Sequence, residues 1–248
     1  MDQAQENTTS PQRYSRITEK NPREIVMLRG NGCAWRRCRF CDYHLDASFD
    51  QAANYALNKQ VLSRVTGVYQ RLEVINSGSF PELDADTQQL IEDVCLKCGI
   101  STLHFECHWI YRAKTEAIRR HFQEKGITVR IKTGVETFDP LFRECYLDKG
   151  IDTDDAAQIA RYFDEVCLLQ GIPGQTKESM ERDIRIGLAY FERVCVNIMT
   201  KNSCQIQPDP GVIQIFLKEL YPKYKNDPRV DLLLQNTDFG VGGNENAQ

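Results

Sequence analysis

GCAWRRCRFC, residues 32–41, follows the first segment of the chain that the apolar pattern predicts to be a β-strand. It holds three cysteines, Cys33, Cys38 and Cys41, within nine residues. Three thiolates can ligate three irons of a [4Fe–4S] cluster and leave the fourth iron open, whereas an electron-transfer cluster normally has four protein ligands. The stretch therefore predicts an iron–sulfur site at which chemistry takes place.

Other sites fit the same spacing. His44 would complete a Cys₃His zinc site, and Cys-x₄-Cys-x₂-Cys also opens plant-type [2Fe–2S] ferredoxins, which need one further cysteine. A thioredoxin-like pair of Cys38 and Cys41 would leave Cys33 without a role. A zinc module that the metal folds is usually small, whereas this chain has 248 residues and can fold without a metal. Spacing leaves the alternatives open, and chain length favours the catalytic cluster.

Length and composition fit one cytoplasmic domain. The 248 residues are 41% hydrophobic, and single α/β barrels often have this size. Ten cysteines and the lack of an N-terminal apolar signal segment indicate a reducing compartment. No apolar run is long enough to cross a bilayer. The net charge of −4 and the lack of a basic stripe argue against nucleic acid as a partner.

Apolar, β-branched runs alternate with helical segments along the chain. We expect strands at about 24–30, 71–77, 102–109, 128–135, 164–172 and 194–200. Helices are expected between them, for example at Asp86–Cys98, Lys114–Lys125, Asp154–Phe163 and Lys177–Arg193. This alternation implies an α/β fold with a parallel sheet and right-handed crossovers, which can curl into an open barrel. The sequence therefore predicts a single domain.

Two end segments flank this domain. Residues 1–20 are polar and contain Pro11, which predicts a flexible lead-in. Residues 211–248 are expected to form a C-terminal helix and a tail. Phe239 is unusual in such a polar tail, so the tail either folds back over the active site or is a disordered end.

Parallel α/β sheets bind ligands at the C-terminal ends of their strands, where the cysteine loop also lies. Polar residues occur at strand ends in any such sheet. What indicates a binding site is that these residues lie at the same edge as the cysteine loop. The candidate site residues at or next to these ends are Ser77, Gly78, Ser79, Glu106, His108, Lys132, Glu136, Gly171, Ile172, Gly174 and Asn197.

The clustered cysteines, Phe40 before the third of them and the repeated strand–helix pattern resemble the radical S-adenosylmethionine (SAM) enzymes over roughly residues 24–210. The resemblance implies a partial (β/α)₆ barrel at 21–210, with a [4Fe–4S] cluster and SAM as cofactors. It also implies that Cys33, Cys38 and Cys41 hold the cluster, and that Phe40 and Glu136 contact SAM. The usual family spacing is Cys-x₃-Cys-x₂-Cys, so this chain has one extra residue in the first gap.

Two further segments match SAM-binding motifs of the family. A Gly-Gly-Glu-like stretch holds the methionine amino group, and here its place is taken by Asn76-Ser77-Gly78-Ser79, which lacks the carboxylate. The stretch Leu169–Glu178 resembles the Gly-Ile/Leu-Pro-Gly-Gln-Thr motif of coproporphyrinogen dehydrogenases and related branches, where it lies against adenine. The resemblance therefore assigns Ser77, Gly78 and Ser79 to SAM, and it also assigns Gly171, Ile172 and Gly174.

Within the family, Asn76–Phe80, Gly134–Thr137 and Asp148–Gly150 look most like the archaeosine-forming branch, which acts on a 7-deazaguanine base in tRNA. This chain is short and acidic and shows no RNA-binding domain, so a free deazapurine base is the simpler substrate. It resembles compact radical SAM enzymes that cleave queuine and release 7-aminomethyl-7-deazaguanine. A tRNA-modifying enzyme and a zinc module remain the alternatives. An electron donor such as flavodoxin or ferredoxin is expected as a partner.

Glu106 and Glu136 are the candidate groups for holding such a base. A carboxylate can accept paired N–H bonds from the amidine edge of a guanine-like base. Alternatively, one of them pairs with Lys132 or Arg130. His108 either orients a substrate hydroxyl or is structural, and Lys132 and Asn197 complete the expected substrate site. Cys95 and Cys98 fit helix-end packing better than a second metal site.

Overall fold

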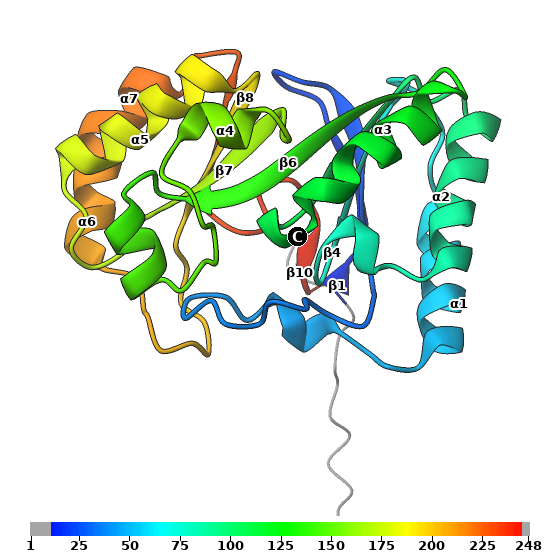
Figure 1. Ribbon diagram of the computed structural model, residues 1–248, viewed down its shortest axis with the longest axis horizontal. Helices are drawn as coiled ribbons and strands as arrows, with labels where there is room; N and C mark the ends of the chain where they lie inside the picture. The colour runs from blue at the N-terminus through cyan, green and yellow to red at the C-terminus, as the bar shows by residue number, and fades with distance from the viewer. Residues whose placement is uncertain (1–10, 245–248) are drawn as a thin grey trace, which may run out of the picture.

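The computed structural model describes residues 11–244. Its main sheet has eight strands in the order β2-β3-β4-β5-β6-β7-β8-β9 and curls into a half-barrel (Figure 1). β2 is antiparallel to β3, and every later neighbouring pair is parallel. The strands are β2 (Tyr14–Ile17), β3 (Arg23–Leu28), β4 (Arg71–Asn76), β5 (Thr102–Glu106), β6 (Thr128–Glu136), β7 (Glu165–Gln170), β8 (Arg193–Ile198) and β9 (Val230–Leu233).

The helices lie around the outside of the sheet, and the cysteine loop runs across its open side (Figure 1). The helices are α1 (Gln51–Leu62), α2 (Ala85–Lys97), α3 (Thr115–Gln123), α4 (Ala156–Ala160), α5 (Lys177–Tyr190), α6 (Pro210–Ile215) and α7 (Tyr221–Tyr224). Shorter turns are η1 (Tyr43–Asp46), η2 (Phe80–Glu82), η3 (Trp109–Lys114), η4 (Phe142–Tyr146) and η5 (Phe216–Leu220). No helix within residues 11–244 is long and apolar enough to cross a membrane.

Capping side chains fix where α2 and α5 begin. α2 begins behind Asp84, whose carboxylate accepts a hydrogen bond from the N–H of Thr87. α5 begins behind Thr176, whose hydroxyl accepts from the N–H of Ser179. Because Thr176 ends the Gly-Ile-Pro-Gly-Gln-Thr motif, that motif also sets the start of a helix.

The predicted α/β fold and its six inner strands are confirmed, and the ends of the chain differ from expectation. The flexible lead-in predicted for 1–20 is wrong for Tyr14–Ile17, which pair with β3 as an edge strand. Residues 1–10 lie outside the described part of the chain. At the other end, the sequence missed β9, which adds an eighth strand beside β8. Both are edge strands of four residues, so neither shows the long apolar runs that mark the inner strands.

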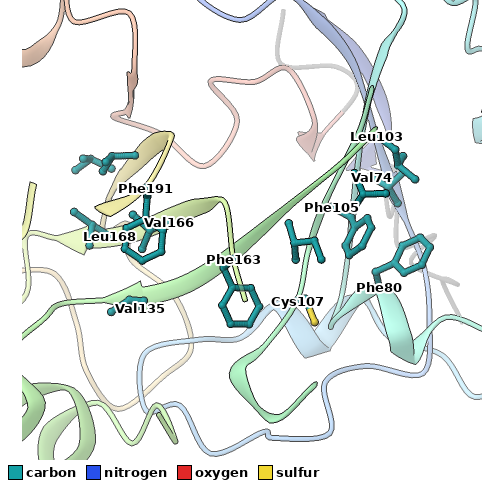
Figure 2. Close-up of a cluster of buried hydrophobic side chains, with 14 of the residues drawn as sticks. Val74, Phe80, Leu103, Phe105, Cys107, Val135, Phe163, Val166, Leu168 and Phe191 are labelled. Atoms are coloured by element: carbon teal, nitrogen blue, oxygen red, sulfur yellow. The ribbon is translucent and has the colours of Figure 1, made fainter. Parts of the chain in front are cut away.

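The core fills the space between the sheet and its helices. Alternate side chains of a strand point to opposite faces. On β5, Leu103 and Phe105 pack into the core (Figure 2), whereas Glu106 faces the concave side. The ring of Phe80, the first residue of η2, stacks on Phe105 with centroids 4.2 Å apart. This alternation leaves the concave face free for polar groups.

Replacing Phe105 tests this core. Its side chain is 1% exposed, so Phe105→Ala should lower the free energy of unfolding by about 3–5 kcal/mol, measured by urea denaturation. The matched control is Val68→Ala, which removes an exposed apolar side chain and should cost less than about 0.5 kcal/mol. Equal losses for the two variants would contradict the assignment of Phe105 to the core.

Candidate active site

A cavity of about 570 Å³ lies on the concave face, at the C-terminal ends of the parallel strands. Most of the residues that the sequence singled out line it: Cys33, Cys38, Phe40, Cys41, Ser77, Gly78, Ser79, Glu106, His108, Lys132, Glu136 and Asn197. Three do not: Gly171, Ile172 and Gly174. The cavity therefore unites the predicted cluster loop with the predicted substrate groups.

The cysteine loop is attached to the opposite half of the sheet. The N–H of Arg39 donates to the carbonyl of Leu147 at 3.1 Å, and the carbonyl of Arg39 accepts from the N–H of Ile206 at 3.1 Å. The side-chain amide of Asn202 donates to the carbonyl of Phe40 at 2.7 Å. Leu147 follows β6 and Ile206 follows β8, so a loop that begins at β3 spans the open side of the half-barrel (Figure 1).

Trp35 fixes the first half of the same loop. Its indole N–H donates to the carbonyl of Asp148 at 2.8 Å, and its ring stacks on His108 with centroids 5.5 Å apart. The ring also lies directly against Gly150, where an added Cβ would sit 2.2 Å from it. Gly150 has φ +76°, so a glycine is required there both by backbone conformation and by space.

His108 is the ring on which Trp35 stacks, and backbone groups hold it in place. Its Nε2 lies 2.9 Å from the carbonyl of Lys149, to which it can donate, and its Nδ1 accepts from the N–H of Ile110 at 3.3 Å. Burial, helped by the charge of Lys149, lowers the pKa of His108 to about 3, so the ring is neutral. Because backbone groups occupy both ring nitrogens, the structural alternative fits His108 better than the expected substrate contact.

The three cysteines have the donor chemistry that a [4Fe–4S] cluster requires. Cys33, Cys38 and Cys41 are free thiols, half-buried, and all three line the cavity. Cys38 and Cys41 pack against an apolar wall that includes Phe40, which keeps water away from this side. Within residues 11–244, no three His, Cys, Asp or Glu side chains are close enough to hold a metal ion. The donor set thus fits, and the sulfur atoms must still turn toward one another.

The loop after β4 packs tightly on the cysteine loop. A Cβ at Gly78 would lie 2.7 Å from the carbonyl oxygen of Gly32, so only glycine allows this approach. Ser77 and Ser79 are buried on either side of it, and the hydroxyl of Ser79 accepts from the N–H of His108 at 3.0 Å. The predicted SAM loop therefore lies beside the predicted cluster loop.

Glu82 is a site residue that the sequence analysis missed. Its carboxylate accepts from the N–H groups of Ser79 and Ala34 at 2.5 and 2.6 Å, and from the hydroxyl of Tyr111 at 2.9 Å. It therefore joins the β4 loop to the cysteine loop. It also provides a carboxylate next to Asn76–Ser79, the segment that lacks the carboxylate of the family motif. The Ser-x-x-Glu spacing of Ser79 and Glu82 is that of a capping box and could have identified it.

The Gly-Ile-Pro-Gly-Gln-Thr motif supports the cavity from behind. Gln175 donates its side-chain amide to the carbonyl of Leu169 and accepts from the N–H of Ile172, both at 2.9 Å. Ile172 is fully buried and packs in one cluster with Phe40 and Met199, which line the cavity. Ile172 therefore lies behind the cavity wall that its neighbours form, and its expected contact with adenine stays a prediction.

Glu106 and Glu136 have different surroundings. Glu136 pairs with Lys149 at 2.8 Å and follows a bulge in β6, with φ +68°. Glu106 makes no side-chain hydrogen bond or ion pair to any residue within 11–244, and it faces the cavity. Burial raises the pKa of Glu106, although Lys132 acts in the opposite direction. Of the two candidates, only Glu106 presents an unpartnered carboxylate.

A row of buried charges lies under the cavity. Glu73 on β4 accepts from the guanidinium of Arg23 at 2.5 Å and from the ammonium of Lys132. Burial alone would raise the pKa of Glu73, but the two cations outweigh it and hold the pKa well below its usual range. The alternative pairing of Glu106 or Glu136 with Lys132 or Arg130 is not formed, because Lys132 pairs with Glu73 and Arg130 pairs with Glu192.

The C-terminal segment forms another wall of the cavity. Phe239 packs against Leu233, Cys167 and Cys195, and the guanidinium of Arg23 lies 5.0 Å from its ring. β10 (Gly242–Asn244) then pairs with β1 (Pro11–Gln12), which lies beside it in Figure 1. Residues 245–248 lie outside the described part of the chain.

Comparison with known proteins identifies the family. A solved queuine lyase from Clostridium spiroforme, bound to SAM and queuine, is 43% identical to this chain, with a TM-score of 0.90. The match covers 94% of this chain and 100% of that one. A sporulation-specific glycosylase from Bacillus subtilis is 10% identical, with coverage of 85% and 80% and a TM-score of 0.32, and carries no argument. No family model and no curated protein matches the chain.

The half-barrel and the three-cysteine loop are those of a radical SAM enzyme. Within that class, the chain belongs to the queuine lyase family. Membership favours the iron–sulfur interpretation of the cysteine loop over the zinc alternative with His44.

Removing single cysteines tests the cluster ligands. Since each thiolate should ligate one iron, Cys33→Ala, Cys38→Ala and Cys41→Ala should each abolish the [4Fe–4S] absorbance after anaerobic reconstitution. Iron and sulfide analysis measures the loss. Cys98→Ala, which changes a half-buried thiol outside the cavity, should keep the cluster. Full iron content in Cys38→Ala would contradict the assignment.

Gly150→Ala tests whether Trp35 fixes the cysteine loop. The matched control is Gly126→Ala, which has nearly the same φ of +77° but nothing within 4 Å of the new methyl group. Both variants should lose about 1–2 kcal/mol of stability from backbone strain. Only Gly150→Ala should also bind less iron per folded chain, because the methyl group displaces Trp35. Equal iron content in the two variants would exclude this role.

Proposed function

We propose that this protein is a radical SAM lyase that cleaves a carbon–nitrogen bond of queuine and releases 7-aminomethyl-7-deazaguanine. The observation that carries the proposal is the agreement with a queuine lyase bound to SAM and queuine, at 43% identity over its whole length. The cavity of about 570 Å³ supports it, because this volume suits a small-molecule ligand. A free deazapurine base is therefore the substrate.

The cysteine loop would hold the cluster and SAM at one end of the cavity. Cys33, Cys38 and Cys41 would ligate three irons of a [4Fe–4S] cluster, which with SAM supplies a 5′-deoxyadenosyl radical when reduced. The protein would place SAM between the cysteine loop and the loop after β4. The apolar walls of the cavity, including Phe40 and Met199, would exclude water from the reacting groups.

Glu106 would hold the deazaguanine base. Its carboxylate faces the cavity without a partner among the described residues, and an amidine edge offers two N–H donors in the geometry that a carboxylate accepts. Asn197 lines the cavity from β8 and can add a neutral hydrogen bond. Glu136 is less suited to this role, because Lys149 already neutralises it.

The reaction needs a reductant and reduced thiols. An electron carrier of the flavodoxin or ferredoxin type would reduce the cluster. All ten cysteines are free, which fits a reducing compartment such as the cytoplasm.

Product analysis tests the proposed activity. The reconstituted, reduced protein with SAM and queuine should form 5′-deoxyadenosine and 7-aminomethyl-7-deazaguanine, both measurable by liquid chromatography with mass spectrometry. A parallel incubation with queuosine-containing tRNA should leave the tRNA unchanged. Intact queuine, together with modification of the tRNA, would refute the lyase and favour the tRNA-modifying alternative.

Glu106→Gln tests the substrate contact. A hydrogen bond to a charged group contributes about 1.5–3 kcal/mol, so kcat/KM for queuine should fall about 10- to 150-fold while SAM affinity is kept. Glu116→Gln makes the same change on the exposed face of α3 and should have no effect. Because only the carboxylate accepts both N–H bonds, wild-type kcat/KM should fall as pH drops through the raised pKa of Glu106. Persistence of that acid limb in Glu106→Gln would assign it to another group.

A further inference from the structure

Two thiols outside the cysteine loop face the cavity from neighbouring strands. Cys167 on β7 and Cys195 on β8 lie directly opposite each other in the parallel pairing of these strands, and both line the cavity. Their side chains share a hydrogen bond. Both thiols are free and buried, and Phe239 packs against them. The predicted cluster ligands do not account for this pair.

The pair lies next to the groups proposed to hold queuine. The Cys195 thiol donates a hydrogen bond at 3.8 Å to the side-chain oxygen of Asn197, which lines the cavity two residues further along β8. The hydrogen bond with Cys195 and burial hold the pKa of Cys167 well above its usual range, while the nearby charges of Lys132 and Glu106 act on it in opposite directions. Cys167 therefore keeps its proton at neutral pH, close to the expected substrate contacts.

The proposed reaction leaves a carbon radical that needs a hydrogen atom. When radical chemistry breaks the C–N bond of queuine, the unpaired electron stays on the ring fragment. Because 5′-deoxyadenosine is released as a product, the hydrogen atom that it carries does not return to that fragment. An S–H bond is much weaker than the O–H bond of an alcohol and weaker than most C–H bonds, so a thiol can supply the missing hydrogen.

Other donors that line the cavity are less suited to this step. The thiol of Cys107 donates to the carbonyl of His108 at 3.7 Å and packs into the core. Tyr43 can also give up a hydrogen atom, but it is 58% exposed, whereas Cys195 is 5% exposed and lies behind Phe239. The three thiols of the cysteine loop would bind iron as thiolates and carry no hydrogen.

We propose that Cys195 donates a hydrogen atom to the carbon radical on the ring fragment of queuine. The inference rests on the proposed function. The S–H bond of Cys195 breaks and a C–H bond forms, which leaves a thiyl radical on Cys195. One electron from the flavodoxin- or ferredoxin-type carrier and one proton from water then restore the thiol. One electron starts the radical reaction and one ends it, so each queuine consumes two electrons from the carrier.

Alkylation tests whether Cys195 lies at the substrate, without any turnover. In the cluster-loaded protein with SAM and no reductant, saturating queuine should slow the reaction of Cys195 with iodoacetamide at least about 10-fold, measured by peptide mass spectrometry. The control is Cys145, an exposed thiol outside the cavity, which should react equally with and without queuine. Equal alkylation of Cys195 in both conditions would overturn the proposal.

Turnover in D₂O tests the transfer itself. Thiols exchange their proton with solvent, so the ring fragment from wild type should carry one deuterium on carbon, and one 5′-deoxyadenosine should form per queuine cleaved. Cys195→Ser keeps a hydroxyl beside Asn197 but loses the weak S–H bond. It should still form 5′-deoxyadenosine in the first turnover, whereas the deuterated fragment should fall at least about 10-fold. Cys95→Ser changes a buried thiol of α2 outside the cavity and should give the wild-type label per queuine cleaved.

An unlabelled fragment from wild type would overturn the proposal without any variant having to fold. Wild-type amounts of deuterated fragment from Cys195→Ser, or a loss confined to Cys167→Ser, would also overturn it. So would many queuine molecules cleaved per 5′-deoxyadenosine, because the hydrogen would then return from that product. Failure of the proposed function has a separate signature: reduced wild type with SAM would release 5′-deoxyadenosine and leave queuine intact.

Discussion

The attachment of the cysteine loop across the open side of the half-barrel is the constraint on which the site depends. A half-barrel leaves its last strand far from its first, so a loop after β3 can reach the far half only by spanning the opening. The two backbone hydrogen bonds of Arg39, to Leu147 and from Ile206, fix that span. The loop thereby closes one side of the cavity, and its three thiols are part of the cavity lining.

Close backbone approaches make this attachment possible. Gly78 lets the β4 loop lie against Gly32, and Gly150 lets the segment after η4 lie under Trp35. The carboxylate of Glu82 then accepts hydrogen bonds from N–H groups of both loops, in place of water. Since backbone groups removed from water must be paired, these contacts decide where the cysteine loop can rest.

The row of buried charges under the cavity has a different role. Burying a charge is costly unless a partner compensates it, and Glu73 has two partners in Arg23 and Lys132. Because both cations pair with Glu73, neither of them is paired with Glu106. The unpaired carboxylate of Glu106 is therefore a consequence of how the neighbouring strands distribute their charges, and it is the group best placed to bind a cationic or donor-rich edge.

The sequence by itself determined the α/β class, the inner strands and the position of the cysteine loop after the first of them, because apolar periodicity and local spacing are properties of short segments. Its resemblance to the radical SAM enzymes also indicated the cofactors. Only the tertiary structure decided which strand-end groups are free: Lys132 is taken by Glu73, His108 by backbone groups, and Ile172 is buried behind Phe40. Such pairings join residues far apart in the chain, and no local pattern encodes which of several possible partners a side chain contacts. The roles of Glu82 and Phe239 depended on the fold for the same reason, since each acts on segments distant in sequence.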